Sequence, residues 1–76
     1  MYILVVTSGD FAGRYIGLNI AGLRKVLDNH VPLEIPIAGT GFSLFRDEVG
    51  AYHLTELSAL TLQAALLKFG LTTELR

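Results

Sequence analysis

The residues best suited to chemistry lie in one short loop near the start of the chain. Residues 7–14 read Thr-Ser-Gly-Asp-Phe-Ala-Gly-Arg and follow a short apolar run. If a helix begins after this loop, its free backbone N–H groups and positive dipole end can hold an anion. A phosphate or carboxylate site would then be lined by two hydroxyls, two glycines and one arginine, namely Thr7, Ser8, Gly9, Gly13 and Arg14.

The same loop also has a purely structural interpretation, which we favour. Gly9 and Gly13 can turn the chain, while Ser8 or Asp10 caps the following helix. The carboxylate of Asp10 would repel a bound anion. The glycine spacing matches neither the P-loop nor the dinucleotide fingerprint. The anion site therefore stays an alternative hypothesis.

Two family resemblances fall on this loop. Residues 7–10, with Gly17, Asn19 and Arg24, resemble the first strand–loop–helix of phosphofructokinases, although extra residues separate the loop from Gly17. Residues 5–13 look like the opening of a KOW motif of transcription and ribosomal proteins, although Ile16 stands where that motif has glycine. The second resemblance implies a ribonucleoprotein partner. Each covers less than a third of the chain.

No other residues form a catalytic or metal-binding pattern. His30 and His53 stand apart, with no carboxylate at metal-ligand spacing. The chain has no cysteine, which excludes disulfides and thiolate metal sites. We therefore expect no metal, no cofactor and no enzymatic activity.

The first half of the chain predicts a strand followed by a helix. Residues 2–7 are apolar on both faces, which is typical of a buried strand. From about Gly13, Ile16, Ile20, Leu23 and Leu27 share one face at helical spacing. In the alternative, an all-β barrel, residues 15–20 continue as a strand because Ile16, Leu18 and Ile20 also alternate.

The second half predicts three strands and a helix. Residues 33–37 alternate, and Pro36 places this strand at a sheet edge or a bulge because proline donates no ladder hydrogen bond. A turn at residues 39–41 leads into strands at 42–46 and 51–55, which residues 47–50 join as a hairpin. The closing helix begins near Glu56 with Thr55 as its N-cap and stops at Gly70. Residues 72–76 are expected to fray.

These elements predict one α+β domain spanning residues 1–76. The order β-α-β-β-β-α gives a small two-layer sandwich, with both helices packed on one face of a short mixed sheet. The first two strands would run parallel, joined by a right-handed crossover.

The closing helix is apolar on two opposite sides. The first stripe holds Leu57, Leu60, Ala64, Leu67 and Leu71. The second stripe holds Ala59, Leu62, Leu66 and Phe69. A surface helix needs only one apolar stripe to cover its own core. We expect the second stripe to form an interface, built on Leu62, Leu66 and Phe69.

Composition favours association with protein. Hydrophobic residues make up 51% of the chain and charged residues 17%, against about 25% charged in typical domains. The net charge is −1 and the cations are scattered, so we expect no direct nucleic-acid binding. The apolar start is short and has no basic region before it, so we expect neither a signal peptide nor a membrane span. The prediction is a non-enzymatic, cytoplasmic interaction module that binds itself, a larger protein, or both.

Overall fold

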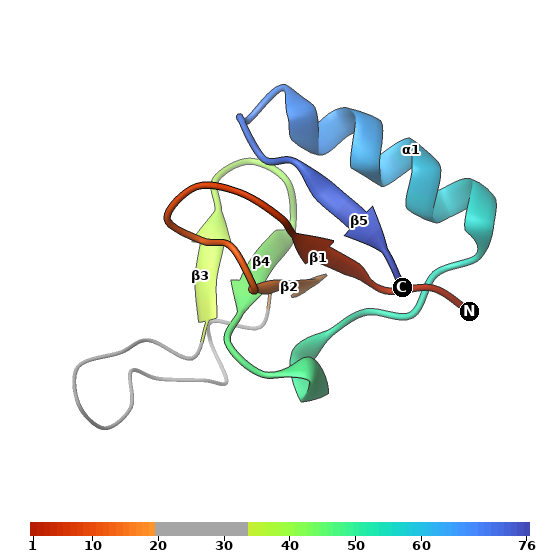
Figure 1. Cartoon of the computed structure of the whole chain (residues 1–76), viewed down its shortest axis with the longest axis horizontal. Coiled ribbons are helices and arrows are strands. Elements are labelled where there is room, and N and C mark those ends of the chain that lie inside the picture. The colour runs from red at the N-terminus through yellow and green to blue at the C-terminus, as the bar shows by residue number, and fades with distance from the viewer. Residues whose placement is uncertain (20–33) are drawn as a thin grey trace.

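The computed structural model describes residues 1–19 and 34–76, which form an antiparallel sheet and one α-helix (Figure 1). The α+β class is therefore confirmed for this part of the chain. The elements in chain order are β1 (Leu4–Val6), β2 (Tyr15–Leu18), β3 (Glu34–Ile37), β4 (Phe42–Phe45), the 3-10 helix η2 (Glu48–Gly50), α1 (Glu56–Leu67) and β5 (Thr73–Leu75).

The five described strands lie in the order β3-β4-β2-β1-β5, and every neighbouring pair is antiparallel. The sheet is thus not mixed, and β1 and β2 do not run parallel as the sequence had suggested. Pro36 lies on β3 at one end of this order, which confirms the prediction of an edge strand. A proline is tolerated there because an edge strand needs hydrogen bonds on one side only.

The helix predicted from Gly13 is wrong for its first part, because residues 15–18 form β2. Ile16 lies opposite Leu44 and Gly17 opposite Ser43 in the pairing with β4. Ile16 and Leu18 alternate with a period of two, as the alternative all-β prediction had them, and this is the period of a strand. The rest of the predicted helix, with Ile20, Leu23, Leu27 and His30, lies outside the described residues.

Two segments of the second half also differ from the prediction. Residues 51–55 form no strand but run beside the sheet, where Leu54 and Tyr2 exchange backbone hydrogen bonds of 2.7 and 2.8 Å. The hairpin expected before them is instead the 3-10 helix η2. Residues 72–76 do not fray, because β5 pairs with β1 in the register Val5 opposite Glu74.

The helix α1 begins where the sequence predicted, but it ends before the predicted stop at Gly70. The Thr55 hydroxyl accepts a hydrogen bond of 3.3 Å from the backbone N–H of Ser58, which confirms Thr55 as the N-cap. The helix ends at Leu67, and a turn then reaches Gly70 with its φ of 78°. This left-handed conformation favours glycine, as the sequence analysis expected.

The core lies between α1 and one face of the sheet. It is built from alternate residues of the strands, which share one face, and from two residues of α1. Its buried members are Leu4, Val6, Ile16, Ile37, Leu44, Leu54, Ala59 and Leu66. On the opposite face, η2 covers Phe45 and Gly17. Figure 1 shows α1 lying alongside β5 and β1.

Candidate functional site

The largest run of exposed apolar residues in the described chain follows the outer side of α1. We call this surface the outer stripe, and it consists of Leu57, Leu60, Ala64 and Leu67. Leu57 is 76% exposed, Leu60 47% and Leu67 56%, and Ala64 is exposed as well. A scattered exposed leucine is ordinary, whereas contiguous apolar surface is typical of interaction sites, so we take the outer stripe as the candidate site.

The opposite side of α1, which the sequence pattern predicts to form an interface, covers the chain's own core. Ala59 is fully buried and Leu66 is 1% exposed. Leu62 is partly buried and packs against the same cluster. Leu62 and Leu66 are therefore corrected from interface to core residues. Within α1 the assignment of the two stripes to core and to solvent is thus the reverse of the prediction. Beyond the helix, Leu71 of the first stripe packs against the core and Phe69 of the second is exposed.

Phe69 is the one residue of the predicted interface that stays accessible. It follows the end of α1 and is 51% exposed. Its backbone N–H donates to the carbonyl of Leu66 at 2.9 Å, which holds the turn after the helix.

A groove runs along α1 from Leu57 to Ala65, beside the outer stripe, and Phe42 of β4 lines it as well. Its volume is about 440 Å³ and its walls are mostly apolar. It is lined by Phe42, Leu54, Leu57, Ser58, Thr61, Leu62 and Ala65. Leu57 belongs to both the groove and the outer stripe, so the two form one continuous surface. The sequence did not suggest Phe42 here, because it comes from β4, or Leu54, because it was predicted to lie in a strand.

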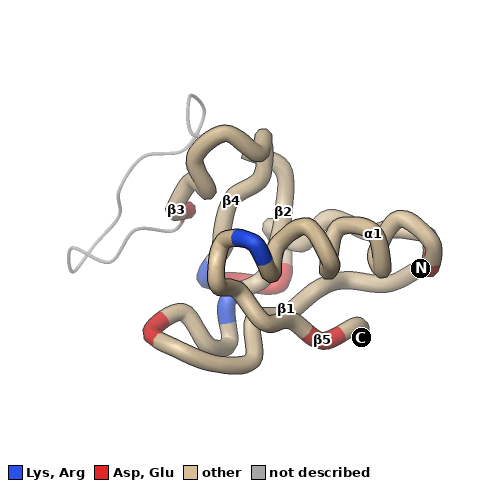
Figure 2. The backbone as a smooth tube through the Cα atoms, turned by 90° about the horizontal axis from the view of Figure 1, so that it is seen from above, with Lys and Arg blue, Asp and Glu red and all other residues tan. Residues whose placement is uncertain are grey.

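The charges of α1 are confined to its two ends. Glu56 is the first residue of the helix and Lys68 caps its C-terminus, and every residue between them is uncharged. The α1 tube in Figure 2 carries no charge colour between these ends. An acidic start and a basic end both suit the helix dipole. Both side chains are exposed, and they mark the limits of the outer stripe.

The loop of residues 7–14 connects two strands of a hairpin, so the proposed anion site lacks the helix on which it depended. The backbone N–H of Val6 donates to the Arg14 carbonyl and that of Gly13 to the Val6 carbonyl, both at 2.8 Å. Gly9 and Gly13 adopt positive φ values of 80° and 91°. Both glycines thus turn the chain as predicted, but Ser8 and Asp10 have no helix to cap because residues 15–18 form β2.

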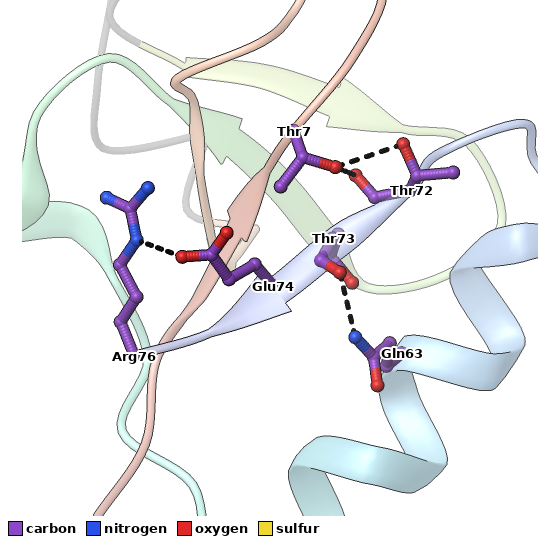
Figure 3. Close-up of polar contacts among 6 residues, drawn as sticks. All are labelled: Thr7, Gln63, Thr72, Thr73, Glu74 and Arg76. Atoms are coloured by element: carbon purple, nitrogen blue, oxygen red, sulfur yellow. Dashed lines mark hydrogen bonds and ion pairs between the residues drawn. The ribbon is translucent and has the colours of Figure 1, made fainter.

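The hydroxyls of this loop are already engaged. Thr7 Oγ1 lies 3.2 Å from both the carbonyl oxygen and Oγ1 of Thr72 (Figure 3). Ser8 Oγ also hydrogen-bonds to Thr72 Oγ1. These contacts join the β1–β2 loop to the residue that precedes β5. No local pattern predicts this cluster, since Thr7 and Thr72 are 65 residues apart.

Polar contacts around β5 fix the strand rather than form a reactive centre. Gln63 Nε2 donates to the Thr73 carbonyl at 2.8 Å, which ties α1 to the strand (Figure 3). Arg76 Nε donates to Glu74 Oε2 at 2.9 Å, and this hydrogen bond raises the pKa of the guanidinium. Both groups are exposed, so the ion pair adds little to stability.

Within residues 1–19 and 34–76, no cluster of histidine, cysteine, aspartate or glutamate could hold a metal ion. His53 is exposed on the segment before α1. Of the helices described, none is long and apolar enough to cross a membrane.

Comparison with known proteins adds no identification. No protein-family model, curated protein or solved structure matches this chain. The function of this chain is therefore inferred from the surface of α1.

Proposed function

We propose that this chain is a small non-enzymatic module that binds protein through the outer stripe of α1 and the adjoining groove. The observation that carries the proposal is the exposure of Leu57, Leu60 and Leu67 on one side of a helix whose other side already covers the core. An amphipathic helix needs one apolar side, and the second has a use only if another molecule covers it.

The chemistry of this surface fits a polypeptide partner. The outer stripe is without charge between Glu56 and Lys68, and the groove beside it is lined mainly by aliphatic side chains. Leucine anchors at spacings of three and four residues match the way helices pack against grooves or against other helices. Such a module acts by binding or occluding another protein.

Placing a photo-reactive amino acid at position 60 tests this proposal. The protein carrying it is irradiated alone, over a range of concentrations, and again in a cell lysate. We expect covalent adducts from position 60 in at least one of the two settings. The matched control carries the same group at Val49, which is 87% exposed on η2. Equal adduct yields from the two positions, or none from position 60, would overturn the proposal.

A further inference from the structure

We infer that the partner is a second copy of this chain, docked by antiparallel pairing of two α1 helices about a two-fold axis. This inference deepens the proposed function, because it uses the outer stripe and names what covers it. The order of residues along the outer stripe supports this inference, because the stripe matches a second copy of itself that runs in the opposite direction.

The stripe is symmetric about the level of Leu62. Leu57 and Leu67 lie five residues on either side of this level, and Leu60 and Ala64 lie two residues on either side. Two antiparallel copies centred there place Leu57 opposite the partner's Leu67, and Leu60 opposite the partner's Ala64. The large side chain of Leu60 thus meets the smallest side chain of the stripe, which lets the helices approach closely.

The spacing of the stripe also fits a helix pair. Its members follow one another at three, four and three residues, which is the a and d pattern of a coiled-coil seam. In an antiparallel seam each a position packs against a d position of the other helix. Taking Leu57 as a and Leu60 as d, both layers described above join an a residue to a d residue.

The terminal charges favour the antiparallel orientation. Glu56 and Lys68 lie six residues on either side of Leu62, so each end of an antiparallel pair brings one carboxylate and one ammonium to the same level. A parallel pair would instead bring Glu56 close to its own copy and Lys68 to its own copy. Opposite charges attract and like charges repel, so the charges select between the two arrangements.

The size of the stripe implies a weak dimer. The 12 residues of α1 span about 18 Å, so a single helix pair buries less than the area of a standard interface. We expect a Kd of about 100 μM, with dimers forming as the concentration rises.

Cysteine pairing tests the orientation directly, because the chain has no cysteine of its own. Leu57→Cys and Leu67→Cys proteins, one of them labelled with heavy nitrogen, are mixed under mild oxidation and resolved by mass spectrometry. We expect the mixed disulfide to form at least about tenfold faster than the Leu57→Cys homodisulfide, since identical positions lie about 15 Å apart in the antiparallel pair. Val49→Cys gives the rate of random encounter.

Charge-reversal variants test the antiparallel orientation independently. The dissociation constant of each dimer is measured by sedimentation at low salt. Glu56→Lys is expected to weaken the dimer about tenfold, because the change repeats at both ends. Adding Lys68→Glu to the same chain is expected to restore it. Both effects should shrink in high salt, where exposed charges are screened.

The outcomes separate this inference from the proposed function. A Leu57→Cys homodisulfide as fast as the mixed one, or a Glu56→Lys protein that dimerises normally, would overturn the antiparallel dimer. If position 60 then still forms specific adducts in lysate, the outer stripe binds a different protein and the proposed function stands. If position 60 forms no adducts in either setting, both proposals are wrong.

Discussion

The carbonyl oxygen of Gly50 lies directly over Gly17, where the chain after β4 crosses the face of the sheet opposite α1. A Cβ atom added to Gly17 would lie 2.0 Å from this oxygen and 2.7 Å from the ring of Phe45. The contact is possible only because Gly17 has no side chain. It fixes η2 on the face of the sheet opposite α1.

Gly17→Ala is therefore expected to lower the free energy of unfolding by about 3 kcal/mol, because backbone rather than a flexible side chain must move. Gly13→Ala is the comparison, since its Cβ would meet nothing within 4 Å and its cost of about 1 kcal/mol comes only from the positive φ. Urea unfolding of the two variants measures the difference. A Gly17→Ala protein as stable as the wild type would contradict the packing of η2.

Truncation of leucines on the two sides of α1 should have very different costs. Leu66→Ala leaves a cavity at a position that is 1% exposed, so we expect a loss of about 3 kcal/mol. Leu57→Ala removes a side chain that is 76% exposed, and we expect a change within about 0.5 kcal/mol in the dilute monomer. Thermal unfolding at low concentration measures both. The reverse order of costs would mean that Leu57 faces the core and Leu66 faces solvent, as the interface predicted at Leu62 and Leu66 requires.

Two neighbouring threonines should respond in opposite ways to the same substitution. Thr72→Val removes the hydroxyl that contacts Thr7 and Ser8, and we expect a loss of about 1 kcal/mol. Thr73→Val removes a hydroxyl that is buried and has no hydrogen-bond partner. Its replacement by a methyl group is expected to leave stability unchanged or to increase it by about 1 kcal/mol. Equal losses in denaturant unfolding would contradict the contacts around β5.

Phosphate should not stabilise the protein. The loop of residues 7–14 has no helix after it, and the hydroxyls of Thr7 and Ser8 bond to Thr72. A ligand that binds only the folded state raises Tm with its concentration. We therefore expect a flat Tm in a phosphate titration, with chloride at matched ionic strength as the control. A rise specific to phosphate would revive the anion site.

Local signals in the sequence predicted several elements well. The apolar run at residues 2–7, the edge position of Pro36 and the cap at Thr55 each depend on residues close together in the chain. The helix predicted after Gly13 was wrong at β2 because Ile16 and Ile20 fit both the helical and the strand period. Pairing with β4 decides between these periods, and that pairing is not visible locally.

The candidate site was predicted only in part, for a related reason. Periodicity revealed two apolar sides of α1, but it could not tell which side faces the sheet. That choice depends on contacts of Ala59 and Leu66 with strands distant in the chain. The strand β5 was missed because it is only three residues long and pairs with β1 at the other end of the chain.

The pairing of Leu4 with Leu75 also bears on how the chain reaches its fold. Helix α1 can form within about a microsecond, because its hydrogen bonds join residues four apart. The β1–β5 ladder must instead bring together segments separated by almost the whole described chain, and the entropy of closing so long a loop opposes it. We expect this ladder to form late and to set a folding time of milliseconds or longer. Until then the edge of β1 stays open to pairing with other chains.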